Sequence, residues 1–499
     1  MRHALPSSYS LRRHASFFLF GSLSMTDSSS VVRLSRAGLY LLLAGQLLPM
    51  IDFSIVNVAL DATAISLHAT EVQLELIVAV YGVTFAVCLA MGGRLGDNFG
   101  RRRLFGWGVA LFTLASLLCG VATSVWMLLG ARILQGAAAA LAMPQILATI
   151  HVGLRGREHS RALGLYGAIG GLAFVVGQVL GGLLITLDLG GLGWRSVYLI
   201  NLPVGLAVLA YTGRLVPETR SQHPARIDRP GTLLLALVIL CLLLPISLGP
   251  VLHWPWQCGL ALGAVPVLLY AVWRVELRQE RRQAFPLLPP TLLRLSSMRF
   301  GIGIALLFFS GWSGFLFCMA MTFQAGAGMS PLQSGDTFIA MGTAYFVGSL
   351  CTSRAAARFE RTSVLLFGCL LQMAGLLGMM YTLWRVWPMP SAPNLMLATV
   401  LVGFGQAFIV SSFYRIGLSE VRPEQAGAGS ATLSTVQQSA LGLGPALLGA
   451  VLTYFLNMPG HNYLIASLGV LAAQLGLMSI LVALTVTQGR RQRMRQQAV

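Results

Sequence analysis

The sequence has few charged residues and no lysine at all. Charged side chains make up 10% of its 499 residues and hydrophobic ones 56%, whereas about 25% of the residues of a typical soluble protein are charged. A soluble chain of this size could not bury so much apolar surface. The absence of lysine also excludes a Walker phosphate-binding loop, which requires one. We therefore expect neither a soluble fold nor ATP-driven chemistry by this chain alone.

Motifs of metal centres and hydrolases are absent too. The sequence has no Cys-x-x-Cys pair, cysteine–histidine cluster, Gly-x-Ser-x-Gly or His-Glu-x-x-His stretch. Its net charge of +18 comes with no basic folded module for nucleic acid. We expect no enzyme activity, no metal or other cofactor and no nucleic-acid partner, with the cysteines packed in the core. These cysteines are Cys88, Cys119, Cys241, Cys258, Cys318, Cys351 and Cys369.

What the sequence has instead is a series of long apolar runs. About 20 apolar residues cross the hydrocarbon core of a bilayer as a helix, and such runs recur along nearly the whole chain. Strands of a membrane barrel would be about 10 residues long and alternating. We therefore predict an all-α polytopic membrane protein with 14 transmembrane helices. The predicted helices span residues 37–59, 72–92, 104–122, 125–150, 162–187, 194–213, 230–248, 257–274, 300–322, 332–354, 363–383, 394–414, 427–454 and 462–487.

The arginines give an independent test of these helices. With the N-terminus placed in the cytoplasm, 31 of the 34 arginines fall on the cytoplasmic side of the predicted helices. Arg195 and Arg385 fall on the opposite side, and Arg132 lies within a helix. This asymmetry follows the positive-inside rule. We expect a multi-pass protein of the cell inner (plasma) membrane with both termini in the cytoplasm.

An internal repeat divides the chain into two halves. The stretch SRAAARFERTSVLLFG occupies the same position in the second half as GGRLGDNFGRRRLF in the first. It keeps the small residues, the arginines and the following apolar helix, but has no aspartate. Repeated halves of this kind are typical of transporters. The predicted parts are a cytoplasmic N-terminal segment (1–36), a six-helix bundle (37–213), a linker region with two additional helices (214–299), a second six-helix bundle (300–487) and a basic tail (488–499).

The first 24 residues are expected to add no transmembrane helix. Their apolar run FFLF is too short to span a bilayer, and no signal-peptide cleavage site follows it. Met25 opens an alternative start. We interpret residues 1–24 as a disordered extension or a misplaced start.

Six stretches together resemble one family. With them the chain resembles the 14-helix drug:proton antiporter branch of the major facilitator superfamily, over nearly its whole length after residue 37. Two positions depart from the pattern of the branch, since Gln178 and Asp61 stand where it has proline. The six stretches are GRLGDNFGRRR, LPMIDFSIVNVAL, ARILQGAAAALAMPQ, GWRSVYLINLPVG, PEQAGAGSATLSTVQQ and GAIGG followed by GQVLGG.

The resemblance implies a function. It implies a secondary active transporter that exports small amphipathic or toxic compounds, as in multidrug efflux, in exchange for protons by alternating access. The implied partners are the small-molecule substrate, protons and membrane lipids, with no cofactor beyond the proton gradient. Two alternatives stay open: an exporter or proton symporter of one metabolite, and a non-transporting receptor or lipid-handling protein. A periplasmic adaptor with an outer-membrane channel, used by some branch members, also stays open.

Asp52 and Arg132 place opposite charges inside two predicted helices. A charge within a bilayer is costly unless it is paired or neutralised. At about 1.5 Å per residue, the two lie at similar depth in the outer half of the membrane. We predict that Asp52 carries the proton or binds a cationic substrate and that Arg132 biases its protonation. Gln135 is predicted to bond within the bundle and Gly136 to admit a neighbouring helix. A permanent structural ion pair is the alternative.

The loop after the second predicted helix combines glycines, a carboxylate and arginines. Glycine allows a sharp turn, and a helix N-terminus or a forked arginine stabilises a carboxylate. The resemblance implies that this loop latches one half of the protein against the other and releases it when the cavity changes sides. Simple loop capping is the alternative. The predicted gating residues are Gly93, Gly96, Asp97, Gly100, Arg101, Arg102 and Arg103.

Glycines and one glutamine share a face of the fifth predicted helix. Gly177 and Gly181 form a G-x-x-x-G pair, which is typical of closely packed membrane helices, and Gln178 and Gly182 lie near them. In the family fold this helix meets the tenth predicted helix, which carries Asp336. We therefore predict that Gln178 hydrogen-bonds Asp336 across the two halves when the outer side is closed. A bond from Gln178 to a backbone carbonyl is the alternative.

Overall fold

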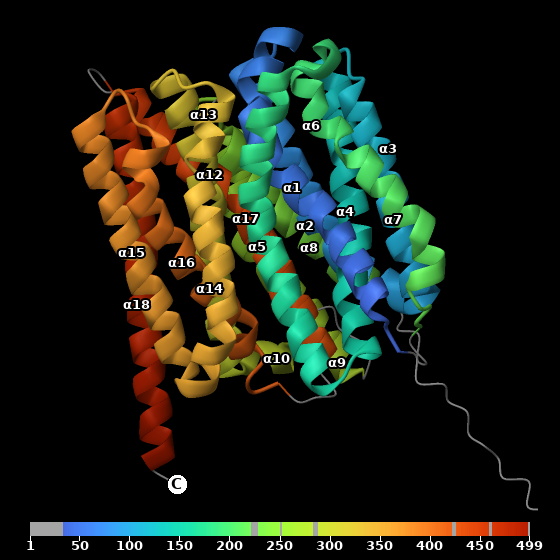
Figure 1. Cartoon of the computed structure of the whole chain (residues 1–499). Coiled ribbons are helices and arrows are strands. Elements are labelled where there is room, and N and C mark those ends of the chain that lie inside the picture. The colour runs from blue at the N-terminus through green and yellow to red at the C-terminus, as the bar shows by residue number, and fades with distance from the viewer. Residues whose placement is uncertain are drawn as a thin grey trace, which may run out of the picture.

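The computed structural model is helical throughout the residues that it describes (Figure 1), which are 33–220, 228–249, 252–282, 288–421, 426–458 and 462–497. Most helices run between an upper end, which holds α6 and α13, and a lower end, which holds α10. The helices are α1 (Arg36–Leu67), α2 (Glu71–Phe99), α3 (Arg101–Gly120), α4 (Val125–Gly153), α5 (Gly156–Leu187), α6 (Ser196–Leu199), α7 (Asn201–Leu215), α8 (Arg229–Leu248), α9 (Trp256–Arg281), α10 (Pro290–Arg294), α11 (Ser296–Ile304), α12 (Ser310–Met321), α13 (Pro331–Asp336), α14 (Ile339–Arg358), α15 (Arg361–Val386), α16 (Ala392–Gly417), α17 (Ala426–Leu456) and α18 (Tyr463–Gln497). Short turns of 3₁₀-helix (Leu189–Gly191, Gly193–Arg195) and π-helix (Ala305–Phe309, Thr322–Gly326) join some of them.

Twelve helices in the described part of the chain are long and apolar enough to cross a membrane. They confirm the predicted all-α membrane architecture. Two of the predicted helices do not meet that measure. For α8, which has 20 residues, the described apolar stretch is Pro230–Ile246. The helix predicted at 332–354 is divided into α13 and α14, where the Phe338 N–H donates to the Gly335 carbonyl at 3.0 Å in a tighter turn. The predicted count of 14 is therefore not confirmed.

Several helices continue beyond the apolar run that predicted them. α1 was expected to end at residue 59 but continues to Leu67, where His68 adopts a left-handed conformation and its N–H donates to the Ala64 carbonyl. Such a cap ends a helix by satisfying its last carbonyls. Hydropathy reports only the part of a helix that is apolar, so it misses this polar extension. Asp52 consequently lies near the middle of a 32-residue helix.

The helices pack into two groups that meet along one seam. The N-terminal group comprises α1–α7 and the C-terminal group comprises α11–α18, by their packing contacts. α5 lies against α13 and α14, and α2 lies against α17, so these pairs form the seam (Figure 1). α8 contacts both α2 and α17. The two additional helices between the groups therefore lie beside the seam through α8.

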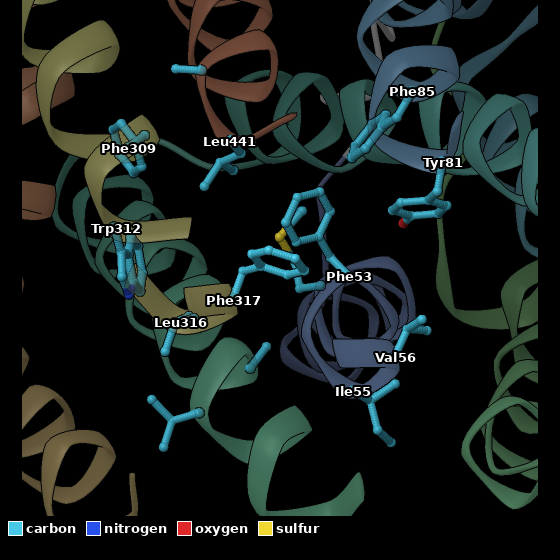
Figure 2. Packing of buried hydrophobic residues seen from close by; sticks show 14 of the residues in the cluster. Phe53, Ile55, Val56, Tyr81, Phe85, Phe309, Trp312, Leu316, Phe317 and Leu441 are labelled. Atoms are coloured by element: carbon cyan, nitrogen blue, oxygen red, sulfur yellow. The ribbon is translucent and has the colours of Figure 1, made fainter. Parts of the chain in front are cut away.

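Large apolar side chains fill much of the space between the groups. Figure 2 shows Phe53 from α1 and Phe317 from α12 close to each other, with Tyr81 on the α2 side and Trp312 on the α12 side. The Phe53 and Tyr81 ring centroids are 5.9 Å apart. Because such a packed interior offers no water, a polar group buried beside it needs a partner within the protein.

Candidate functional site

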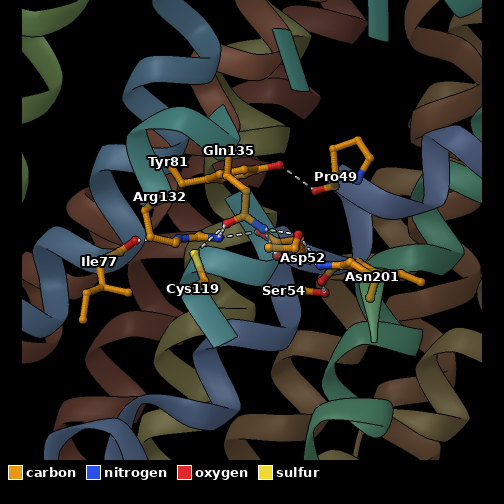
Figure 3. A network of polar contacts seen from close by, with 11 residues as sticks. Pro49, Asp52, Ser54, Ile77, Tyr81, Cys119, Arg132, Gln135 and Asn201 are labelled. Carbon is orange, nitrogen blue, oxygen red and sulfur yellow. Dashed lines mark hydrogen bonds and ion pairs between the residues drawn. The ribbon is translucent and has the colours of Figure 1, made fainter. Parts of the chain in front are cut away.

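A buried ion pair joins α1 to α4. The Arg132 guanidinium donates to the Asp52 carboxylate, and the two side chains are 1% and 0% exposed. Gln135 Nε2 donates to Asp52 Oδ1 at 2.8 Å, and Arg132 Nη1 donates to Gln135 Oε1 at 2.9 Å. Three of the residues predicted as the transport site thus form one closed triangle of hydrogen bonds (Figure 3).

Two more polar residues join this network from α3 and α7. Asn201 Nδ2 donates to Asp52 Oδ1 at 3.2 Å and to Ser116 Oγ at 3.3 Å. The Ser116 hydroxyl also accepts from Gln135 Nε2 at 2.9 Å. Asn201 and Ser116 were not predicted. Asn201 lies in the stretch GWRSVYLINLPVG, so the motif contained the signal, but the motif alone did not indicate which of its residues faces Asp52.

Aromatic rings and a backbone carbonyl hold the other side of Arg132. Its Nε donates to the Ile77 carbonyl at 3.1 Å. Its guanidinium carbon lies 4.3 Å from the Tyr81 ring centroid and 5.9 Å from that of Tyr198. The Tyr81 hydroxyl donates to the Pro49 carbonyl at 2.9 Å. Arg132 is therefore fixed by an ion pair, hydrogen bonds and cation–π contacts at once.

Gly136 lets α4 approach α2 beside this network. A Cβ added to Gly136 would lie 2.5 Å from the Tyr81 carbonyl oxygen, closer than any real side chain could sit. Since Tyr81 covers Arg132, this close approach helps to set the distance between the ring and the guanidinium. The predicted role of Gly136 as a contact point for a neighbouring helix agrees with this geometry.

The network encloses an oppositely charged pair within a closed interior. A carboxylate and a guanidinium together are neutral, and each is costly to bury alone. Protonating Asp52 would leave the charge of Arg132 without its counterion. The arrangement therefore links the protonation of one carboxylate to the solvation that Arg132 requires.

The predicted gating loop bends between α2 and α3. The Asp97 carboxylate accepts from Arg101 Nη2 at 2.6 Å and from Nε at 3.2 Å. Both residues belong to the N-terminal group, so among the described residues Asp97 forms no latch to the C-terminal group. Asp97 pairs with Arg101 because Arg101 is only four positions further along the chain, which places its guanidinium within reach of the carboxylate.

Glu218, which was not predicted, holds the beginning of α3. Its carboxylate accepts from the Arg102 N–H at 3.1 Å and lies 3.7 Å and 3.8 Å from the Nε atoms of Arg102 and Arg103. Gly100 has φ +104°, and a Cβ there would lie 2.7 Å from Glu218 Oε1. A carboxylate at a helix N-terminus is favourable. The predicted capping therefore occurs, but its carboxylate comes from the segment after α7 and not from Asp97.

The remaining glycines of the loop pack against α4. A Cβ at Gly96 would collide with the Gln145 side chain, whose Nε2 donates to the Gly92 carbonyl at 2.8 Å. A Cβ at Gly93 would lie 3.7 Å from Pro144. Gly96 is thus required by a close approach within the N-terminal group, whereas Gly93 sits at an ordinary distance.

The glycines of α5 face two partners instead of one. Gly177 and Gly181 lie against Ser54 and Ile55 of α1, within the N-terminal group. Gly182 lies against the Pro331 backbone of α13, across the seam. The prediction of close helix packing is confirmed, and of these three glycines Gly182 is the one that meets α13. Gly177 and Gly181 are four residues apart and share a face, whereas Gly182 is one residue further, about 100° around the helix, and meets a second neighbour.

The predicted Gln178–Asp336 hydrogen bond is not formed. Both polar side-chain atoms of Gln178 are buried without a hydrogen-bond partner in the described residues. The backbones themselves are close, since a Cβ at Gly335 would lie 2.9 Å from the Gln178 carbonyl oxygen. α5 therefore meets α13 through backbone and glycine, and Asp336 is half-buried next to this contact.

Comparisons with known proteins agree with this fold. The chain is 35% identical over 429 residues to a probable actinorhodin transporter of Streptomyces coelicolor, covering 85% of this chain and 73% of that protein. It is 31% identical to a puromycin resistance protein of Streptomyces alboniger, covering 83% and 81%. The structure of the human organic anion transporter MFSD10 aligns with a TM-score of 0.61 at 17% identity, covering 90% of this chain and 98% of that one.

A family model also matches, and it spans most of the chain. The model described as Major Facilitator Superfamily matches residues 42–445 and 301–496. The relatives named for antibiotic resistance or transport are consistent with the drug:proton antiporter branch that the sequence motifs resemble. By its matched length and its relatives, the chain belongs to the Major Facilitator Superfamily.

Proposed function

We propose that this protein exports small amphipathic or toxic compounds in exchange for protons, by alternating access. The observation that carries the proposal is the closed network of Asp52, Arg132 and Gln135, which buries a titratable group inside the N-terminal group. Relatives named as antibiotic and multidrug resistance proteins support export. As a multi-pass transporter of this family, the protein is not an enzyme.

The proposed location is the cell inner membrane, with both termini in the cytoplasm. The lower end in Figure 1 is then the cytoplasmic end. α8 and the α13–α14 pair are proposed to cross the membrane with the twelve more apolar helices, which gives 14. α8 has 20 residues, which span about 30 Å as a helix and so reach across the hydrocarbon core.

Alternating access follows from the way the two groups meet. The N-terminal and C-terminal groups are proposed to rock against each other along the seam. In the conformation described, α5 packs against α13 towards the upper end, so that side is closed. Rocking opens one side while the other closes, because the helices within each group are more tightly packed than the groups are with each other.

Proton coupling then has a physical basis. When water reaches Asp52 and a proton binds, the carboxylate no longer compensates Arg132. Leaving the guanidinium buried without its counterion is costly, so the protonated state favours a conformation in which Arg132 meets water. Losing the proton restores the closed ion pair. A ligand or proton that binds two states unequally shifts the population between them.

Inverted membrane vesicles test this proposal. Under an imposed proton gradient, substrate addition to the normal protein should release protons, and the Asp52→Asn variant should release none while still reaching the membrane. Asp61→Asn is the matched control, because Asp61 is an exposed carboxylate on the same helix. Undiminished proton-linked export by Asp52→Asn would contradict the proposal. Ligand binding without any proton movement in the normal protein would support a receptor instead.

A further inference from the structure

Glu75 is an acidic side chain near the upper end of α2 that none of the recognised motifs includes. It lies four residues after the start of the helix at Glu71, about 6 Å along the helix axis. The apolar span Val72–Leu89 surrounds it in sequence. An ionisable residue within such a span points to a function, because placing it there has a cost.

The structure places Glu75 in the wall of a pocket between the two groups. Phe53 of α1 and Phe317 of α12 both line this pocket, and Figure 2 shows their rings close to each other. Four helices contribute, two from each group, so the pocket straddles the seam. The residues that line it are Phe53, Glu75, Val78, Ala79, Phe317, Gly442, Pro445, Ala446 and Ala450.

The lining combines one carboxylate with aromatic and apolar side chains. Glu75 supplies a carboxylate, Phe53 and Phe317 supply aromatic faces, and the other residues are apolar. Aromatic rings attract cations through their negative faces, and a carboxylate adds a full negative charge in a partly water-free space. Ligand pockets typically combine an apolar wall with a few polar groups that orient the ligand. An organic cation with an apolar body matches this lining in its chemistry, and because the closed pocket holds only about 20 Å³, such a ligand enters when the two groups separate.

The pocket adjoins the ion-pair network through two rings. Phe53 follows Asp52 in the chain, and its ring centroid lies 5.9 Å from that of Tyr81. The Tyr81 ring in turn covers the Arg132 guanidinium at 4.3 Å. A ligand that displaces Phe53 therefore acts on the ring that holds Arg132.

We propose that this pocket binds the cationic group of the exported compound, with Glu75 as the residue that recognises the charge. The inference rests on the proposed export function, because it assigns the substrate class to the same transport path. Since both groups contribute to the wall, separating them along the seam opens the pocket, and closing them seals or releases the ligand.

Binding to the purified full-length protein in detergent tests the inference. The probes are tetraphenylphosphonium, a cation, and triphenylphosphine oxide, a neutral compound of similar shape, and calorimetry gives both dissociation constants. The normal protein should bind the cation at least about tenfold more tightly, as expected for one charge pair. Glu75→Gln should abolish this preference, and Glu75→Asp should keep part of it. Asp61→Asn, which removes an exposed carboxylate outside the pocket, should leave it unchanged.

Three results would overturn the inference. They are no binding of the cation, no preference for it in the normal protein, and an unchanged preference in Glu75→Gln. A thermal unfolding curve checks that each variant is folded, and Glu75→Asp keeps the test meaningful if Glu75→Gln is not. The assay needs neither a proton gradient nor export. The two proposals can therefore fail separately. Absent transport in vesicles would contradict export, whereas absent charge preference in the binding assay would contradict the role of Glu75.

Discussion

Both groups bury aromatic rings, but among the described residues only the N-terminal group also buries charged side chains. In the first, Asp52 and Arg132 are enclosed with hydrogen-bonding partners from four helices. Among the described residues of the second, no charged side chain is buried. There Phe309 and Trp312 pack with ring centroids 6.1 Å apart, and Trp312 stacks on Tyr345 at 6.1 Å. The repeat therefore preserves helices but not chemistry, because the buried ion pair of the first group has no counterpart among the described residues of the second.

Arg132→Met, in the group that buries charge, should cause the largest loss of stability. It leaves the Asp52 charge buried without its counterion, which should lower the free energy of unfolding by about 3–5 kcal/mol. Adding Asp52→Asn should recover most of that loss, because the remaining groups are then neutral. Unfolding curves in detergent measure both variants. If the double variant is as unstable as Arg132→Met, the two charges do not compensate each other.

Gly136→Ala tests the close helix contact behind the network. The added methyl group would meet the Tyr81 backbone at 2.5 Å, and overpacking of this kind costs about 1–3 kcal/mol. Gly130→Ala on the same helix is the matched control, since nothing lies within 4 Å of its Cβ position. It should be neutral or stabilise the helix by up to about 1 kcal/mol. Equal melting temperatures for the two variants would argue against the tight contact.

Polar side chains of the two groups should respond differently to removal. Asn201→Ala takes a hydrogen bond from Asp52 and should lower stability by about 1–2 kcal/mol. In the C-terminal group, the amide atoms of Gln372 are buried without a hydrogen-bond partner in the described residues. Gln372→Leu should therefore be neutral or stabilising. Parallel unfolding curves decide this, and a larger loss from Gln372→Leu than from Asn201→Ala would reverse the contrast.

Glu218→Gln should have the smallest effect among the substitutions expected to destabilise the protein. The carboxylate is about one quarter exposed and lies beside Arg102 and Arg103, and such partly exposed pairs contribute less than about 1 kcal/mol. The loss should shrink further at high salt, because salt screens exposed charges. Melting curves at two salt concentrations test this. A salt-independent loss would assign the effect to the cap of α3 alone.

Much of the candidate site could be predicted because a charged side chain inside a membrane must be paired, neutralised or exposed to water. Asp52 and Arg132 have opposite charge and similar depth, so pairing was the cheapest arrangement, and the structure pairs them. Asn201 and Glu218 were missed because polar residues near many helix ends and loops are equally plausible partners. The Gln178–Asp336 bond was wrong because sharing a seam does not determine the direction of a side chain.

The sequence by itself determined that this is a multi-helix membrane protein. The length of an apolar run and its low charge are properties of consecutive residues, so they can be counted without knowing which helices pack together. The sequence also indicated which charges needed partners. Only the tertiary structure decided that Asn201 and Ser116 join Asp52, that Asp97 pairs within its own loop, and that Glu75 lines a pocket at the seam. The reason is geometric. A hydrogen bond or a pocket wall depends on how far each helix is rotated and shifted, to within about 1 Å, and local sequence does not specify that relation between distant helices.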